Sequence, residues 1–295
     1  MRVRAPCRSL LFTPADRLSA VRKALAMTAL DAVIIDLEDA VSVQAKEASR
    51  EGLSAFLSSL PPSRPHFPRI LVRVNCPVTT EYGKQDLASI VAPYTDKLDG
   101  LLLPKVESNA TIASAAALVS AKLPVWCMIE SARGVESAHA LAANPLVEGL
   151  VFGSNDYAKD IRAQPSSDGG RREPLLFALS RTVNAARAEG KQVVDGVFMD
   201  LRDDGTGLER EARQGRALGF DGKSLIHPTQ VAVTNRVFSP SAQDVAHAHA
   251  VSAAFAAAQR EGKGVCVVDG RLIEALHVDQ ARDTLTLHES LQRRE

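Results

Sequence analysis

The chain has 295 residues, and 45% of them are hydrophobic, which is enough to bury a full core without disulfides or structural metals. Its 35 basic residues balance 35 acidic ones, so the composition excludes the broad positive field that attracts nucleic acid or an anionic membrane. We therefore expect an ordinary globular protein that binds any anionic ligand locally.

The amino-terminal segment has a basic start but only a short apolar stretch before Thr13 and Pro14. Such a stretch is too short for a signal-peptide core or a membrane span, so we predict a cytoplasmic location. The four cysteines are widely scattered, without the spacing of a zinc site or of a secreted disulfide scaffold. We expect them to be reduced thiols that serve packing.

Eight apolar, strand-like runs recur along the chain. They are residues 9–14, 32–38, 70–75, 100–106, 125–131, 149–156, 192–197 and 222–227. Segments with helical spacing of apolar residues lie between them. This alternation over about 230 residues predicts an α/β fold, a (β/α)8 TIM barrel of the usual size of about 250 residues, with a doubly wound open sheet as the competing arrangement.

The pattern changes after the segment FSPS at residues 238–241. An alanine-rich helical stretch comes next, and then two short apolar runs flank Asp269 and Gly270, a dipeptide that suits a type I′ hairpin turn. We therefore expect residues 1–237 to form a catalytic barrel. Residues 238–295 should form a C-terminal helical and hairpin arm that packs on a neighbouring subunit.

Polar side chains follow the predicted strands where catalytic groups of such barrels lie, at the carboxyl ends. They are Asp36, Glu38, Asp39, Arg73, Asn75, Lys105, Glu107, Glu130, Asn155, Asp156, Asp195 and His227. For any one of them the alternative is a residue that only caps the following helix.

Several carboxylates at one mouth would repel each other strongly, so a bound cation is the natural remedy. With oxygen ligands and no cysteine or histidine cluster, we expect a hard cation, namely Mg2+, with Mn2+ as the alternative.

At these residues the sequence resembles the citrate lyase beta-subunit-like family of metal-dependent carbon-carbon lyases, which includes malyl-CoA and citramalyl-CoA lyases. The resemblance covers nearly the whole chain. It rests on nine motifs in order: RSLLFTPADR, DAVIIDLEDAV, LVRVN, LLLPKVES, MIESARG, VFGSND, VVDGVFMD, LGFDGKSLIHPTQ and FSPS.

The resemblance implies a Mg2+ ion held by Glu130 and Asp156, which explains why the apolar run at residues 125–129 is followed by a carboxylate. It implies that Arg73 binds the substrate carboxylate and the developing enolate oxygen, a task that suits a planar guanidinium. Glu38 and Asp39 would orient the water shell of the metal.

The resemblance also implies a coenzyme A substrate. Phe12, Arg17 and Lys23 match positions that meet the adenine and phosphates of CoA in the family members that use it. No nucleic acid or membrane partner is expected.

In the CoA lyases of the family, a C-terminal segment resembling GxMIDxP reaches from a neighbouring subunit and carries a catalytic aspartate. Here the segment reads GRLIEAL, so Glu274 takes that place and the proline is absent. We expect Glu274 to act as the general base in trans, in a homo-oligomer such as a trimer or hexamer. The alternatives for the base are Glu38, Asp39 or a metal-bound hydroxide.

The leading expectation is a Mg2+-dependent lyase that cleaves a short 3-hydroxyacyl-CoA, of malyl-CoA or citramalyl-CoA type, to acetyl-CoA and a 2-oxo acid. The same class of thioester could instead be hydrolysed, or the substrate could be tethered to a carrier protein as in citrate lyase. A further alternative is an acyl-CoA-binding protein that has lost turnover through the change at Glu274.

Overall fold

The structure is a computed structural model that describes residues 5–61, 68–119, 123–164 and 172–293. The chain divides into two compact units. Cys7–Arg236 form the first, and the described residues of Met1–Pro6 and Val237–Glu295 form the second.

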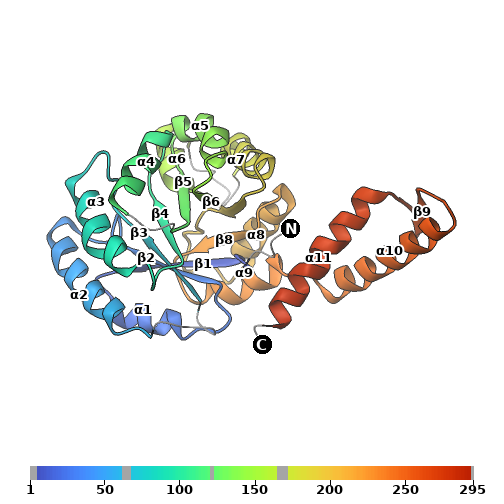
Figure 1. The fold of residues 1–295 in the computed structure, drawn as a ribbon, viewed down its shortest axis with the longest axis horizontal. Helices are drawn as coiled ribbons and strands as arrows, with labels where there is room; N and C mark the ends of the chain where they lie inside the picture. Colours follow the sequence, from blue (N-terminus) through green and yellow to red (C-terminus); the bar gives the residue numbers. More distant parts are fainter. Residues whose placement is uncertain (1–4, 62–67, 120–122, 165–171, 294–295) are drawn as a thin grey trace. The chain divides into compact units, whose positions relative to one another are not determined.

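The first unit contains eight strands that close into a barrel, in which every neighbouring pair is parallel and β1 pairs with β8 (Figure 1). The (β/α)8 prediction is therefore confirmed. The strands are β1 Ser9–Pro14, β2 Ala32–Asp36, β3 Arg69–Arg73, β4 Gly100–Leu103, β5 Val125–Ile129, β6 Val147–Phe152, β7 Gln192–Asp195 and β8 Gly222–Leu225.

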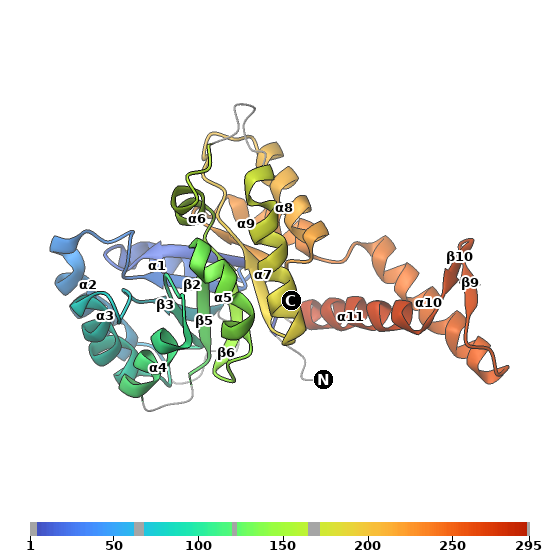
Figure 2. The ribbon, with the colours of Figure 1, turned by 90° about the horizontal axis from the view of Figure 1, so that it is seen from above.

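Helices follow the strands and surround the barrel (Figures 1 and 2). They are α1 Leu18–Leu25, α2 Lys46–Ser58, α3 Glu81–Asp86, α4 Asn109–Leu118, α5 Ala132–Ala142, α6 Ser154–Asp160, α7 Leu176–Ala188, α8 Thr206–Leu218 and α9 Gln230–Phe238. Shorter helical turns occur at Val43–Ala45, Leu87–Val91, Ala92–Tyr94 and Glu173–Leu175. Within the described residues, no helix is both long and apolar enough to span a membrane.

The barrel interior is filled by side chains around Trp126, whose side chain is fully buried. The indole takes the space that side chains at Gly149 and Gly100 would otherwise occupy. A Cβ at Gly149 would lie 2.6 Å from Cε3 of the ring, and one at Gly100 would lie 3.2 Å from Cδ1. Small residues on β4 and β6 therefore make room for the large residue on β5 between them.

The second unit pairs two long helices, α10 Ala242–Arg260 and α11 Ala275–Gln292, with a hairpin formed by β9 Cys266–Val268 and β10 Arg271–Ile273. Asp269 and Gly270 both have positive φ, 49° and 74°, as a type I′ turn requires, so the predicted hairpin is confirmed. Phe255, Val268 and Ile273 belong to its small core. Exposed apolar side chains also gather on and around the hairpin: Val265, Val267, Leu272 and Leu276.

Replacing Gly149 by alanine should destabilise the barrel by about 1–3 kcal/mol, because the new methyl group overlaps the Trp126 ring. Urea unfolding would measure the loss. Gly52→Ala on α2 is the matched control, since its Cβ meets only the flexible end of Leu18 and alanine favours a helix. Equal unfolding free energies for Gly149→Ala and wild type would contradict the packing argument.

Candidate active site

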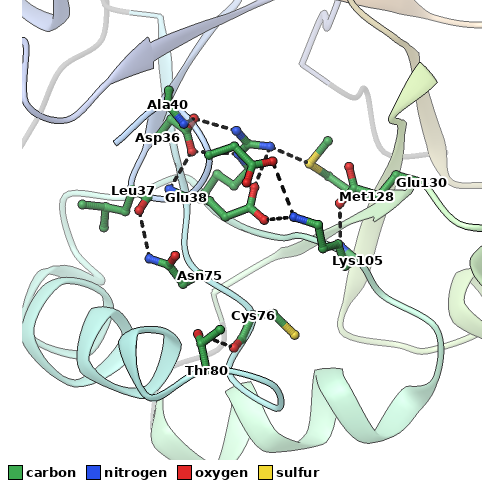
Figure 3. A network of polar contacts seen from close by, with 12 residues as sticks. Asp36, Leu37, Glu38, Ala40, Asn75, Cys76, Thr80, Lys105, Met128 and Glu130 are labelled. Carbon is green, nitrogen blue, oxygen red and sulfur yellow. Dashed lines mark hydrogen bonds and ion pairs between the residues drawn. The ribbon is translucent and has the colours of Figure 1, made fainter. Parts of the chain in front are cut away.

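The candidate site forms at the carboxyl ends of β2 to β6, and its central cation is Arg73 at the end of β3. Asp36 ends β2 and is the register partner of Arg73. The guanidinium donates two hydrogen bonds to the Asp36 carboxylate, from Nε at 2.7 Å and from Nη2 at 2.6 Å, and Nη1 lies 2.9 Å from Oε2 of Glu38. Arg73 thus holds two carboxylates of the neighbouring strand end together (Figure 3).

The environment of Arg73 keeps it charged and fixed. It is 8% exposed, with the ring centroid of Phe12 4.8 Å from its Cζ and Sδ of Met128 3.6 Å from Nη1. Burial lowers the pKa of the guanidinium, but the attraction and hydrogen bonds of Asp36 outweigh this effect and raise it above the ordinary value. Phe12 therefore lies against the central cation, which sequence reasoning did not foresee.

Lys105, two residues beyond β4, connects three carboxylates of the site. Its ammonium group donates to Oε1 of Glu38 and lies 3.5 Å from Oδ2 of Asp39, while its backbone N–H donates to Oε1 of Glu130 at 2.6 Å (Figure 3). The residue has φ of 51°, the left-handed conformation that non-glycine residues rarely adopt. The sequence places Lys105 at a strand end, but it carries no signal of the positive φ or of the contacts with these carboxylates.

Glu38 is almost fully buried between the two cations. Burial raises the pKa of its carboxyl group, against the lowering effect of Arg73 and Lys105. Asp39, the next residue, is exposed and reaches only Lys105 at longer range. The expected pair thus divides into one buried and one solvent-facing carboxylate.

Glu130 directly follows β5 and is 3% exposed. Its carboxylate packs against Gly153, where a Cβ would lie 2.5 Å from Oε2. Burial raises the pKa of Glu130 to about 7, and the negative charges of Glu38 and Asp156 add to the effect. The glycine of the FGSND motif is therefore required by the carboxylate of the MIES motif.

Asp156 is the third residue of α6, partly exposed, and close enough to Glu130 to raise its pKa. Within the described ranges, no cluster of three or more acidic, histidine or cysteine side chains forms a closed metal cage. An open pair of carboxylates fits Mg2+, which is commonly held by one or two carboxylates while several waters remain. The donor set at Glu130 and Asp156 therefore suits this ion.

The remaining predicted residues lie elsewhere. Arg17, just before α1, and Lys23, in the last turn of α1, are both exposed. Glu274 precedes α11 in the second unit, where it is exposed and its backbone N–H donates to Nδ1 of His277 at 3.0 Å. The action of Glu274 in trans stays a prediction.

Two strand-end residues that we expected at the mouth are engaged in other contacts. The Asp195 side chain is fully buried and paired with Arg172 and Lys223, so the expectation that it joins the acidic mouth is wrong. It points to the opposite side of β7 from Val194, which faces the barrel interior. Asn75 donates from Nδ2 to Asp86 at 2.7 Å and to the carbonyl of Leu37 at 2.9 Å.

A groove of about 840 Å3 lies away from these groups, along α2 and α3. Its lining includes Glu47, Arg50 and Tyr82, and it contains none of the residues predicted for catalysis or metal binding. The candidate site therefore does not coincide with this groove.

The burial of Glu130 predicts a pH effect on metal-free protein. A folded pKa of about 7 exceeds the ordinary 4.5, so this residue favours folding most below pH 4.5, and its contribution falls until about pH 7. Glu130→Gln removes this dependence, and its stability relative to wild type should rise by about 2 kcal/mol from pH 5 to pH 8. Urea unfolding in EDTA measures the difference.

The control for this pH series is Glu136→Gln, which changes an exposed glutamate on α5 that pairs with Arg181. Its stability should follow the wild-type pH profile. Parallel profiles for wild type and Glu130→Gln would show that the protonation of Glu130 does not differ between the folded and unfolded protein.

Comparisons with known proteins agree with this arrangement. A model of the HpcH/HpaI aldolase/citrate lyase family matches residues 8–228. The (3S)-malyl-CoA thioesterase of Cereibacter sphaeroides is 42% identical over 286 residues, covering 97% of this chain and 96% of the relative. The L-malyl-CoA/beta-methylmalyl-CoA lyase of the same species is 32% identical over 300 residues, covering 94% and 92%.

Among solved structures, CitE from Mycobacterium tuberculosis in complex with magnesium, acetoacetate and coenzyme A has a TM-score of 0.78 and 31% identity. The match covers 95% of this chain and 97% of that one. These findings confirm the resemblance inferred from the nine motifs. The chain belongs to the HpcH/HpaI aldolase/citrate lyase family.

Proposed function

We propose that the protein is a Mg2+-dependent carbon-carbon lyase that cleaves a short 3-hydroxyacyl-CoA with a distal carboxylate, of malyl-CoA or citramalyl-CoA type. The observation that carries the proposal is the open carboxylate pair Glu130 and Asp156 beside the Arg73 ion pairs. The names of the malyl-CoA relatives and the magnesium and coenzyme A of the CitE complex support the substrate class.

Glu130 and Asp156 would hold Mg2+, which when bound acts as a Lewis acid toward the hydroxyl and carboxylate of the substrate. Glu38 and Asp39 would orient ordered water near the ion. Lys105 forms a close ion pair with Glu38 and lies 3.5 Å from Oδ2 of the exposed Asp39. The Lys105 backbone N–H also fixes Glu130. Lys105 therefore holds Glu38 and Glu130 in place beside the proposed metal site.

The lyase reaction would transfer a proton twice and shift two electron pairs. A general base removes the hydroxyl proton, and the O–H electron pair forms the carbonyl of the 2-oxo acid at C3. The electron pair of the C2–C3 bond passes to the thioester enolate, which is then protonated at C2 to acetyl-CoA. Arg73 would counter the developing negative charge, since Asp36 already fixes its plane and no reorganisation is needed. The other product is a 2-oxo acid, glyoxylate or pyruvate.

Arg17 and Lys23 are exposed cations near the amino-terminal strand, and we assign them to the CoA phosphates. The family resemblance assigns Phe12 a contact with the adenine of CoA. The same ring also packs against Arg73, the proposed catalytic cation.

Thioester hydrolysis is the second candidate. It is favoured by the relative at 42% identity, which is named a thioesterase, whereas the lyase relative is 32% identical. In that reaction water would attack the thioester carbonyl and release free CoA and malate, while the carbon-carbon bond would stay intact.

One experiment separates the candidates. The protein is incubated with Mg2+ and malyl-CoA or citramalyl-CoA, and acetyl-CoA, free CoA and 2-oxo acid are followed separately. Acetyl-CoA and 2-oxo acid in equal amounts support the lyase. Free CoA without 2-oxo acid supports the hydrolase, and binding without any product identifies a non-catalytic protein.

Glu130→Ala and Asp156→Ala should each abolish turnover and weaken Mg2+ binding, because each removes one of the two proposed metal ligands. Isothermal titration calorimetry measures the binding, and circular dichroism checks the fold. The exposed Glu136→Gln variant should bind Mg2+ like wild type. Near-normal turnover of either alanine variant at low Mg2+ would contradict the ligand assignment.

We also propose that Glu274 is the general base and acts on the site of a neighbouring subunit. A base contributes about 10²- to 10⁴-fold in rate, so Glu274→Gln should lower kcat by that factor with Mg2+ binding unchanged. Glu289→Gln, another exposed glutamate of α11, is the control.

Mixing subunits tests the action in trans. Glu274→Gln and Arg73→Ala proteins, each inactive alone, should regain partial activity when assembled into one oligomer. Failure of a verified mixed oligomer to regain activity would refute action in trans. Full activity of Glu274→Gln alone would refute its role as the base.

A further inference from the structure

Four charged side chains are buried together where β7 and β8 meet α8: Asp195, Lys223, Glu211 and Arg172, here called the ionic tetrad. Nζ of Lys223 lies 2.6 Å from Oε1 of Glu211 and 3.3 Å from Oδ2 of Asp195. Nη1 of Arg172 lies 2.7 Å from Oδ1 of Asp195. None of the four belongs to the carboxylate site described above.

The tetrad is not explained by stability alone. Lys223 and Asp195 are fully buried, and ion pairs removed from water stabilise a fold no better than apolar side chains of similar volume. Burial raises the pKa of Asp195, but the charges of Lys223 and Arg172 lower it by more. The pKa therefore lies below its ordinary value, and the carboxylate stays ionised. Two positive and two negative charges thus form a neutral set with fixed geometry.

The tetrad also holds the backbone of Gly196, the residue after β7. Lys223 Nζ donates to the Gly196 carbonyl at 2.6 Å, and the Gly196 N–H donates to Oδ1 of Asp195 at 2.8 Å. Both polar backbone groups of Gly196 are therefore held by members of the tetrad.

Gly196 in turn packs against the start of α6. A Cβ on Gly196 would overlap Oγ of Ser154, the first residue of α6, and would lie 3.0 Å from the carbonyl of Phe152 at the end of β6. Asp156 lies in the first turn of α6 with Ser154. Gly153, the residue before Ser154, packs on Glu130. Close contacts therefore run from the tetrad to both carboxylates of the proposed metal site.

We propose that the ionic tetrad, with Lys223 at its centre, positions Asp156 and Glu130 through Gly196 and the first turn of α6. Lys223 is then a positioning residue that sets the affinity for a divalent cation without touching it. The inference rests on the proposed function for its metal, but the positioning of α6 can also be measured without metal.

The first test compares Lys223→Met with Arg69→Met. Arg69, the first residue of β3, lies over the Trp126 ring, and its Nη1 is 2.8 Å from Oε1 of Glu148 on β6, so its loss should destabilise the barrel without removing a charge of the tetrad. Both variants should lose unfolding free energy. Only Lys223→Met should weaken Mg2+ binding, by about 10- to 100-fold, as measured by calorimetry.

A second series removes no charge and stays informative if Lys223→Met fails to fold. Gly196→Ala should weaken Mg2+ binding, because its methyl group meets Ser154. Ser154→Gly removes the hydroxyl that the new methyl group meets. The Gly196→Ala/Ser154→Gly double variant should therefore bind Mg2+ nearly as tightly as Ser154→Gly alone. Unchanged Mg2+ affinity in a folded Gly196→Ala protein would overturn the proposal.

Hydrogen exchange in EDTA gives the readout without metal. Amides of α6 should lose protection in Lys223→Met and Gly196→Ala but keep it in Arg69→Met. Equal protection of α6 in all the variants would overturn the positioning role. If wild type binds no Mg2+ while α6 protection changes as expected, the metal assignment fails and the positioning role stands.

Discussion

The site depends on one ion pair, the bidentate contact between Arg73 and Asp36. Parallel register places the last residues of β2 and β3 side by side, so a guanidinium and a carboxylate meet there with little freedom. The carboxylates of Glu38, Asp39, Glu130 and Asp156 gather around this point and would repel one another without counter-charge. Arg73 and Lys105 supply part of that charge, and a divalent cation would supply the rest.

Close backbone packing provides the second constraint. Gly153 gives space to the Glu130 carboxylate, and Gly196 lets the β7 end approach Ser154. Neither glycine has the positive φ that would require glycine for conformational reasons, so what matters at both is the absence of a side chain. Motif glycines of this chain thus allow close packing, and their contacts link the carboxylates of the proposed metal site to the buried ionic tetrad.

The two units hold different parts of the proposed chemistry. The barrel holds Glu38 and Glu130, whose pKa values burial raises, and the second unit carries Glu274, the proposed base, exposed before α11. Lyase and hydrolase chemistry would use the same carboxylates and the same cations. They differ in where a proton is removed and in whether water reaches the thioester carbonyl, so the position of the general base decides between the two reactions.

The sequence by itself determined the barrel, the hairpin at Asp269 and Gly270, and the strand ends at Arg73 and Glu130, whereas Asp156, expected at a strand end, lies in the first turn of α6. Alternating apolar runs and turn dipeptides are local signals, and parallel strands place their carboxyl ends on one side. Only the tertiary structure decided which strand-end residues face the mouth. Strands buried on both faces give no alternating pattern, so Asp195 could not be assigned to the helix-facing side of the barrel wall.

The left-handed Lys105 and the stacking of Phe12 on Arg73 were likewise decided by tertiary structure. Both involve residues of different strands, Lys105 with Glu130 after β5 and Phe12 on β1 with Arg73 on β3, and local spacing does not specify such contacts.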